Sequence, residues 1–395
     1  MEARTWLPLL LPASSIALYL LVLVVFLREM RRHRRAPKIE LDRAPLVTIL
    51  KPLAGADDEL DLNLESFATI DYPAFEIVFG VASLDDAALP AARRFLARHP
   101  KIAARIVLTD PDAALNPKVA QLVALDRVAR GEVVVISDSN VRVAKTYLWS
   151  VVRELAMPRA GLVTHVFAGR GERSFGAALE NLQLGAMVVP GVVAAGALVG
   201  RALTVGKSMG MRRRDLVLLG GFARFGDVLA EDHALGVAFG EAGFGIRTSL
   251  DVIVNANVSC GIERTMERHT RWAKLRRVIA PGAFALEPFF SPLLVATIVA
   301  LATRTTAAFV VVVLAACVQI AGSAIAVRRL RGRAFGLLHA PLEVLRTWVL
   351  FVCWLRACAS VEVCWRGHRF QLRRGSQLVP VVSSAGLKLR GETPA

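Results

Sequence analysis

The sequence predicts an α/β domain with a mostly parallel sheet, flanked by transmembrane helices at both ends of the chain. Three observations support this fold class. Between residues 40 and 280, short β-branched runs alternate with helical stretches, as in parallel sheets. Apolar runs of membrane-spanning length lie before and after that region. The 395 residues are 54% hydrophobic with a mean hydropathy of +0.48, which is more apolar than ordinary water-soluble proteins.

The first element is an apolar run from Trp6 to Leu27, long enough to cross ~30 Å of hydrocarbon. A signal peptide would carry its positive charge before a shorter apolar region, so we do not predict cleavage. A basic cluster ends the run: Arg28, Arg31, Arg32, Arg34, Arg35 and Lys38. By the positive-inside rule, the N-terminus faces outward and the chain enters the cytoplasm at Arg28.

The α/β region follows. Strands are predicted at Val47–Leu50, Ile77–Val81, Ile106–Leu108 and Val133–Ile136, and helices at Ala87–His99 and Lys118–Ala129. Within this region, Met187 to Val205 is apolar but interrupted by proline and glycine residues. We expect it to be an interfacial or buried segment near the bilayer, in preference to a simple core helix.

Beyond Pro288, Phe289–Thr303 and Thr306–Val327 predict a hairpin of two spans that turns at Arg304. Arginines follow at 328, 329, 331 and 333, as a return to the cytoplasm requires. The next apolar stretch contains Glu343, Arg346 and Arg356, and the two arginines lie too close together for a span between them. We interpret this stretch as amphipathic and lying on the inner leaflet, which keeps the basic C-terminal region cytoplasmic.

These elements divide the chain into five predicted segments. They are an N-terminal transmembrane helix with a basic juxtamembrane segment (1–39), a cytoplasmic α/β domain (40–283), a transmembrane hairpin (284–333), an interfacial amphipathic segment that includes Trp365-Arg366-Gly367 (334–375), and a flexible C-terminal tail (376–395).

The formal charge of +16 would suit a nucleic-acid partner. However, the basic residues gather beside apolar runs and the chain has no recognised nucleic-acid module, so we exclude nucleic acid and expect membrane lipids instead. The five cysteines have no metal-ligand spacing and lie mostly in apolar runs. They are therefore predicted to be reduced thiols.

Four charged groups in the α/β region are candidates for chemistry: Asp85-Asp86, Asp138-Ser139-Asn140, Glu231-Asp232-His233, and the basic run from Arg268 to Trp272. The first two follow predicted strands, where ligands of open α/β sheets bind. Each acidic group alone is also typical of a helix cap or a turn. The basic run is also typical of a helix that binds anionic lipid head groups. His165 and His233 suit either metal ligation or structural hydrogen bonds.

The chain resembles the ceramide glucosyltransferase family, glycosyltransferase family 21, whose members have the GT-A fold. The resemblance runs from the first span to about Gly375. It rests on Leu50-Lys51-Pro52-Leu53 with Gly55 and Asp57, Asp71-Tyr72-Pro73, Asn116-Pro117-Lys118-Val119, Ser137 to Val143, Glu231-Asp232, Arg268-x-x-Arg271-Trp272 with Lys274-Leu275-Arg276, and Trp365-Arg366-Gly367. The three Asp groups and the Arg-x-x-Arg-Trp series also occur in processive glycan synthases. The Asn-Pro-Lys segment, the segment Asp138 to Val143 and the membrane layout indicate the sphingolipid branch.

The resemblance implies a nucleotide-sugar site. Asp86 matches the family's first Asp, expected near the uridine, and Lys118 is a further nucleotide-binding candidate with a solvated lysine as the alternative. Asp138 matches the position of a cation ligand, with Asn140 as a second oxygen donor, and the implied cation is Mg²⁺ or Mn²⁺. This chain departs from a strict Asp-x-Asp there, since Asn140 is neutral.

The resemblance also implies the reacting groups. Asp232 matches the general base, with the neighbouring Glu231 beside the acceptor. Arg268 and Arg271, three apart on one helical face, suit the leaving diphosphate, and Trp272 is expected as an aromatic platform for the acceptor.

The sequence therefore predicts an inverting membrane glycosyltransferase of the bacterial inner membrane, with its catalytic domain in the cytoplasm. It would move a hexose, with glucose expected, from a UDP-sugar to the primary hydroxyl of ceramide. A hopanoid or another lipid acceptor is the alternative within the same chemistry. The alternative from another class is a non-catalytic membrane protein that binds nucleotide or lipid. Such a protein would not need a general base, so the presence of Asp232 argues against it.

Overall fold

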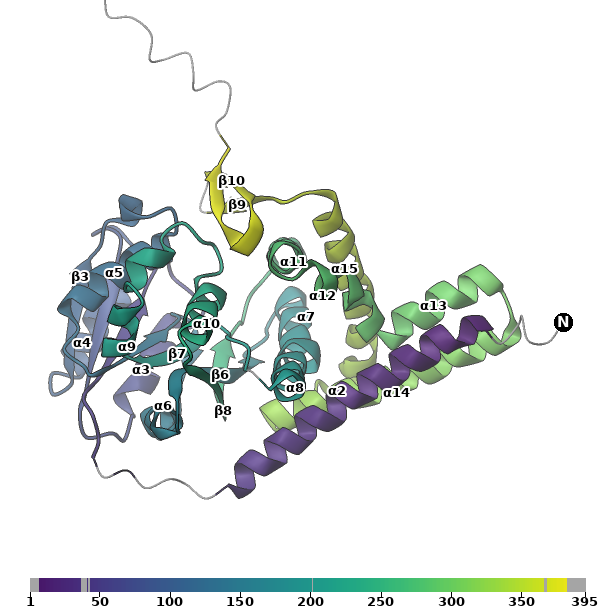
Figure 1. Ribbon diagram of the computed structural model, residues 1–395, viewed down its shortest axis with the longest axis horizontal. Helices are drawn as coiled ribbons and strands as arrows, with labels where there is room; N and C mark the ends of the chain where they lie inside the picture. The colour runs from purple at the N-terminus through teal and green to yellow at the C-terminus, as the bar shows by residue number, and fades with distance from the viewer. Residues whose placement is uncertain (1–6, 37–40, 42, 201, 366–367, 382–395) are drawn as a thin grey trace, which may run out of the picture.

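The computed structural model describes residues 7–36, 41, 43–200, 202–365 and 368–381. Its centre is an eight-stranded sheet with the order β3-β2-β1-β4-β7-β6-β8-β5 (Figure 1). The strands are β1 (Val47–Pro52), β2 (Phe75–Val81), β3 (Ala103–Leu108), β4 (Val133–Ser137), β5 (Val141–Arg142), β6 (Ala160–Arg170), β7 (Ser208–Arg212) and β8 (Gly245–Ala256). The predicted strands and the mostly parallel sheet are confirmed.

Strands β1 to β4 run parallel to one another, and β7 is antiparallel to both of its neighbours, β4 and β6. Strand β8 is parallel to β6, and the short β5 is antiparallel to β8. The antiparallel β7 was not predicted. Its sequence, Ser-Met-Gly-Met-Arg, has no β-branched residue and so lacks the usual strand signal.

Both faces of the sheet are covered, which explains why the central strands are continuous apolar runs without alternation. One face packs on α3 (Leu60–Ala68), α4 (Leu89–Arg98) and α6 (Tyr147–Ala156). The other face packs on α5 (Pro117–Val128), α9 (Arg213–Leu218) and α10 (Glu231–Glu241). Along β1, for example, Ile49 joins the first core and Leu50 the second. The predicted helices correspond to α4 and α5.

Beside the sheet lies a second layer that is entirely helical (Figure 1). It consists of α2 (Leu10–Arg35), α7 (Phe175–Gln183), the π-helical η3 (Leu184–Val188), α8 (Val189–Val199), α11 (Ile262–Ile279), α12 (Pro281–Leu286), α13 (Pro292–Thr303), α14 (Thr306–Arg331) and α15 (His339–Ala359). Helix α2 packs against α8, α13 and α14, although these helices are far apart in the sequence. A small sheet, β9 (Glu362–Trp365), β10 (His368–Leu372) and β11 (Leu378–Pro380), follows α15.

Three helical segments are long and apolar enough to cross a membrane: Leu7–Arg35, Phe175–Val199 and Thr306–Arg331. A fourth candidate is a broken one, since Pro281–Phe290 and Pro292–Thr303 meet at a bend of 76°. Helix α13 alone has 12 residues, which at 1.5 Å per residue is shorter than the ~30 Å of a hydrocarbon core. The first arm of the predicted hairpin is thus bent, and the Met187–Val205 region forms part of a candidate span that is half buried by other helices.

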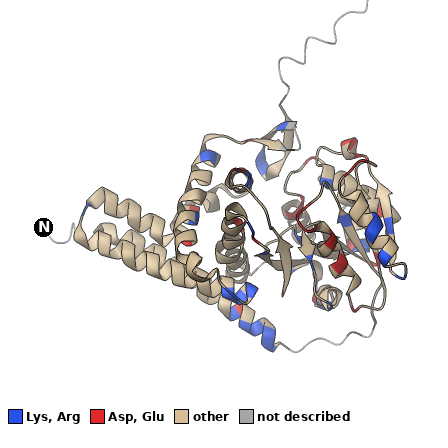
Figure 2. Ribbon diagram, turned by 180° about the vertical axis from the view of Figure 1, so that it is seen from behind, with Lys and Arg blue, Asp and Glu red and all other residues tan. Residues whose placement is uncertain are grey.

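The two basic clusters at the ends of α2 and α14 lie side by side. The guanidinium of Arg329 donates a hydrogen bond to the main-chain oxygen of Met30 at 2.9 Å. Figure 2 shows the blue residues at one end of α2, whereas α2, α13 and α14 are otherwise almost free of charge. This arrangement agrees with both clusters lying on one side of a membrane, as the positive-inside rule requires.

Two charged residues of helix α15, Glu343 and Arg346, point inward, whereas Arg356 is exposed. Glu343 is fully buried, and Arg346 pairs with it while also contacting Gln183 of α7. Gln319 of α14 donates to both Glu343 and Thr347 at 2.8 Å. The placement of this segment at the inner leaflet stays a prediction. The predicted roles of Lys38, Arg366, Gly367 and the tail beyond 381 fall outside the described residues.

Candidate active site

The candidate site lies at one edge of the large sheet. Parallel strands β1, β2 and β4 all end at this edge, and β2 and β4 are each followed by a predicted acidic group, Asp85-Asp86 and Asp138. Because β7 runs the opposite way, it begins where β4 ends, with Ser208 paired to Ser137. The edge therefore collects loops that are more than a hundred residues apart in the sequence.

Asp86 follows β2. Its carboxylate accepts hydrogen bonds from the main-chain N–H groups of Ala88 and Gly55, both at 2.9 Å. The first bond fixes the entry to α4, and the second ties this loop to the loop after β1. The structure thus gives Asp86 a turn role before α4, beside the loop that carries Asp57 and Asp58. Its expected contact with a uridine stays a prediction.

The Asn-Pro-Lys segment starts helix α5. The Asn116 side chain accepts from the N–H groups of Lys118 and Val119, a helix N-cap, and Pro117 occupies the first helical turn, where no N–H is needed. This cap aims Lys118 at the sheet edge. Its ammonium pairs with Asp138 at 2.9 Å and with Glu231 at 2.8 Å, so it joins the second and third acidic groups of the sequence.

Asp138 is surrounded by lysines. Lys118 contacts one carboxylate oxygen, and Lys207 contacts the other at 3.1 Å. Lys207 also donates to the side-chain oxygen of Asn140 at 3.2 Å. The buried Lys51, at the end of β1, donates to the main-chain oxygen of Asp138 at 2.6 Å. Burial alone would raise the pKa of Asp138, but Lys118 and Lys207 outweigh it and lower the pKa to about 2.

The predicted metal ligands do not fit a divalent cation in this arrangement. All of the side-chain oxygens of Asp138 and Asn140 accept from lysine ammonium groups. Among the described residues, no cluster of three or more His, Cys, Asp or Glu side chains could hold a metal ion. His165 lies within the sheet, hydrogen-bonded to Ser150 at 2.9 Å and Ser208 at 3.1 Å, which is a structural role.

Asp232 lies in the first turn of α10, where the partial positive charge of a helix N-terminus favours a carboxylate. One of its oxygens accepts from the main-chain N–H of His233 at 2.8 Å. Gly206 lies against the other oxygen, so closely that a Cβ at position 206 would approach it to 2.8 Å. Burial and then the neighbouring Glu231 raise the pKa of Asp232 to about 6. A carboxyl group with this pKa is well matched to general-base work near neutral pH.

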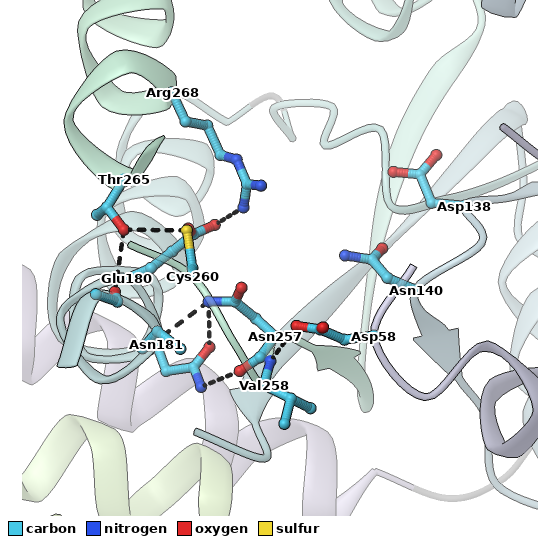
Figure 3. Close-up of polar contacts among 12 residues, drawn as sticks. Asp58, Asp138, Asn140, Glu180, Asn181, Asn257, Val258, Cys260, Thr265 and Arg268 are labelled. Carbon is cyan, nitrogen blue, oxygen red and sulfur yellow. Dashed lines mark hydrogen bonds and ion pairs between the residues drawn. The ribbon is translucent and has the colours of Figure 1, made fainter. Parts of the chain in front are cut away.

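Helix α11 carries a row of arginines across from these carboxylates. Arg264, Arg268 and Arg271, spaced four and three residues apart, share one side of the helix. A polar pocket lies between the helix and the sheet edge, lined by Arg264 and Arg268 together with Asp57, Asn140 and others. Figure 3 shows Arg268 on one side of this space and Asp138 and Asn140 on the other. Arg268 is held by an ion pair with the buried Glu180 of α7.

Arg271 differs from Arg268 in having no anchor. Among the described residues, its half-buried guanidinium forms no ion pair or side-chain hydrogen bond. Its neighbour Trp272 packs against the main core and meets His269 edge-on, with 5.1 Å between ring centroids. Arg271 is therefore a half-buried hydrogen-bond donor that could bind an anionic ligand. Trp272 packs against the core, in addition to its predicted contact with the lipid that receives the sugar.

Three residues of this edge were not among the predicted site residues. Asp58 accepts from the N–H groups of Val258 (2.8 Å) and Ser259 (2.7 Å), and so holds the loop after β8 against the pocket. Lys207 reaches Asp138 only through the pairing of β7 with β4. Arg264 could have been predicted from the sequence, because it lies one helical turn before Arg268 and so extends the spacing of Arg268 and Arg271.

The sheet, its edge of carboxylates and lysines and the facing arginine helix define a glycosyltransferase of the GT-A class. The family model for glycosyl transferase family 21 matches residues 7–378, and the chain belongs to that family. The resemblance inferred from the motifs is confirmed.

Curated relatives agree with this assignment. The chain is 29% identical to ceramide glucosyltransferase 1 of Caenorhabditis elegans over 273 residues, which are 69% of this chain and 58% of that protein. It is 25% identical to ceramide glucosyltransferase 3 of the same organism, over 88% of this chain and 78% of the relative. The first of these matches thus spans a little over half of the relative's length.

Among solved structures, a mannosyltransferase from Pyrobaculum calidifontis in complex with GDP-Man and Mn²⁺ is similar, with a TM-score of 0.49 and 20% identity. The match covers 89% of this chain and 98% of that one. The family assignment rests on the family model and the sequence relatives. Together with the three candidate spans, it indicates membrane association.

Proposed function

We propose that this protein transfers a hexose, with glucose expected, from a UDP-sugar to the primary hydroxyl of a ceramide-like lipid, with inversion at the anomeric carbon. One observation carries the proposal. Lys118 pairs with both Asp138 and Glu231, which are far apart in the sequence, and so brings Asp232, the neighbour of Glu231, to the same sheet edge as Asp138. The family and the names of the curated relatives support the donor and acceptor classes.

The reaction needs a base and a neutralised leaving group. The acceptor hydroxyl oxygen forms a bond to the anomeric carbon while the bond from that carbon to the UDP phosphate oxygen breaks, and its electron pair leaves with UDP. The hydroxyl proton passes to Asp232. The raised pKa of Asp232, due to burial and to Glu231, suits this carboxylate to take a proton.

The charge that develops on the diphosphate falls to the arginines of α11. Arg271 has an unpaired guanidinium fork among the described residues, and a fork can bind two phosphate oxygens at once. Arg268 is oriented by Glu180 and lines the pocket. The lysines around Asp138 and Asn140 do not fit the Mg²⁺ or Mn²⁺ ion expected there from the sequence, and no step here passes through such an ion.

We also propose the membrane arrangement predicted from the sequence: a bacterial inner-membrane protein whose 40–283 region is cytoplasmic. The neighbouring basic ends of α2 and α14 support a common side for both clusters. Reporters fused after residues 40 and 375 should both report the cytoplasm. A C-terminal reporter found outside would contradict the inner-leaflet interpretation of α15.

The proposed activity is tested by incubating purified membranes with ceramide and a panel of UDP-sugars, and identifying the lipid product by mass spectrometry. We expect a hexosylceramide formed from UDP-glucose. A product formed only with a hopanoid would move the proposal to another lipid acceptor. UDP binding without transfer to any lipid would contradict the proposal and favour a non-catalytic binding protein.

A further inference from the structure

We propose that the ammonium group of Lys207 takes the place of a divalent cation between Asp138 and Asn140, and that it binds the donor diphosphate in the absence of metal. This inference rests on the proposed function, because it assumes that a nucleotide diphosphate enters this pocket. It also departs from the cation expected at these two residues. Lys207 would then be a direct binding residue for the donor.

The backbone that carries Lys207 is fixed on every side. The main-chain oxygen of Lys207 accepts from the N–H of Asp138 at 3.1 Å, since β7 begins where β4 ends. Two residues earlier, Val205 exchanges hydrogen bonds with the Thr164 side chain, at 2.8 and 3.0 Å. On the other side, the Ser208 hydroxyl contacts Tyr147 at 2.7 Å. The backbone position of Lys207 is therefore set by strand pairing, and its ammonium is held by Asp138 and Asn140.

The oxygens that would hold a metal ion already hold cations. Lys207 bridges one oxygen of Asp138 and the oxygen of Asn140. Lys118 takes the second Asp138 oxygen and is itself held by Glu231. Mg²⁺ and Mn²⁺ usually bind through carboxylates together with substrate phosphates. Here an incoming ion would have to displace Lys207 from both oxygens and would meet the repulsion of two ammonium charges a few ångströms away.

The same ammonium contacts a residue of the polar pocket, whose lining includes two arginines as well as the carboxylates of Asp57 and Asp58. Asn140, its partner, lines the pocket, and Arg264 and Arg268 line the opposite wall on α11. A diphosphate in this space would meet positive charge from the sheet edge and from the helix together. Lysine binds phosphate as a point charge with three donors, so Lys207 can keep its contact to Asn140 while another N–H turns to the phosphate.

The first test uses the wild-type full-length chain purified in detergent. Free Mn²⁺ is followed by its electron paramagnetic resonance signal as protein is added in the presence of saturating UDP. We expect no site for Mn²⁺ in the wild type, and UDP affinity measured by calorimetry should be unchanged by EDTA. One tightly bound Mn²⁺ per chain, or loss of UDP binding in EDTA, would overturn the proposal without any variant having to fold.

The second test removes the positive charge of Lys207. In Lys207→Met, which keeps the length of the side chain, UDP affinity in EDTA should fall roughly 10- to 100-fold, as expected for losing a charge-assisted hydrogen bond. Asp138 and Asn140 would then be free to take a metal, so Mn²⁺ should bind and restore much of that affinity. The control is Lys101→Met at an exposed lysine, which should behave as the wild type. Equal UDP affinity in EDTA for both variants would contradict the role of Lys207.

These measurements separate the two proposals, because they need no acceptor lipid and no turnover. If no glycolipid forms but the UDP and Mn²⁺ results hold, the proposed function falls and the role of Lys207 stands. If glycolipid forms and the wild type binds Mn²⁺, the role of Lys207 falls and the proposed function stands.

Discussion

A buried charge cluster in the helical layer and another at the sheet edge differ in whether their members are satisfied. In the helical layer, Glu343 and Arg346 pair with each other, and Gln319, Gln183 and Thr347 complete their hydrogen bonds. At the sheet edge, Lys118 joins the carboxylates of Asp138 and Glu231, whereas the neighbouring Asp232 forms no such ion pair within the described part of the chain and has a raised pKa. Arg271, nearby in the predicted series, has no partner among the described residues.

The comparison of these two clusters shows that buried charge alone does not indicate function. A cluster that satisfies all of its members fixes the packing of helices, whereas one that leaves a base or a cation unsatisfied keeps capacity for a ligand. Substitutions in the two clusters should therefore have different consequences. Those at the sheet edge should change turnover and nucleotide binding, and those in the helical layer should change stability.

The largest effect is expected for Asp232→Asn. The variant keeps the size of the side chain but cannot accept a proton, so kcat should fall roughly 10²–10⁴-fold. UDP affinity should change little, because the base acts in the transition state. Glu241→Gln, at the exposed end of the same helix, is the matched control. Product formation at the wild-type rate in Asp232→Asn would remove Asp232 from the chemistry.

The second-largest effect is expected for a substitution in the helical layer, and it is an effect on stability. Arg346→Met leaves the fully buried Glu343 without its cation, and breaking a buried pair in this way costs about 3–5 kcal/mol of unfolding free energy. We expect a clear drop in the thermal unfolding temperature in detergent, with UDP affinity unchanged at low temperature. Arg356→Met changes an exposed arginine of the same helix and should leave stability nearly unaltered. A similar drop in both variants would mean that the buried pair has no special weight.

A smaller effect is expected for Arg271→Lys. A point charge replaces a planar fork, and the loss of one charge-assisted hydrogen bond corresponds to a fall in kcat/KM of roughly 10-fold or more. UDP binding should weaken as well. Arg276→Lys, at an exposed arginine on the same helix, is the control. If the Arg271 variant retained full activity, a role of α11 in binding lipid head groups would become the better explanation.

The smallest expected change is in pH dependence. Asp232 must be deprotonated to act, and its pKa is raised to about 6, so kcat/KM should fall about tenfold per pH unit below that value. Glu231 contributes to the raised pKa as a neighbouring negative charge. In Glu231→Gln the acid limb of the pH profile should therefore move to lower pH. If the acid limb stays at the same pH in Glu231→Gln, the group that titrates in this limb is not Asp232.

The sequence predicted the parts of the fold that depend on local patterns. Buried strands such as β1 and β4 are continuous apolar runs. The N-cap residue Asn116, followed by proline, predicts the start of α5. The chain order of Asp86, Asp138, Asp232 and Arg271 indicated the glycosyltransferase class, and the Asn116-Pro117-Lys118 segment with the membrane layout indicated the family.

The remaining features depend on pairing over long sequence distances. Lys207 joins the site because the antiparallel β7 begins beside the end of β4, and nothing in Ser208 to Arg212 signals such a strand. Similarly, Glu343 and Arg346 are satisfied by residues of α7 and α14, so their inward orientation cannot be read from α15 alone.

The packing of α2 against α14 has a consequence for how the protein is made. The Tyr19 hydroxyl donates to the main-chain oxygen of Gln319 at 3.0 Å, and the two residues are 300 positions apart. At about 5–20 residues per second, roughly 15–60 s pass between the synthesis of the two partners. Throughout that interval the first helix lies in the membrane without α13 and α14, while the nascent α/β region exposes the faces of α7 and η3 that later helices cover. Release of the finished chain, rather than of any earlier fragment, is then the event that completes folding, and residues 40–283 expressed alone should aggregate.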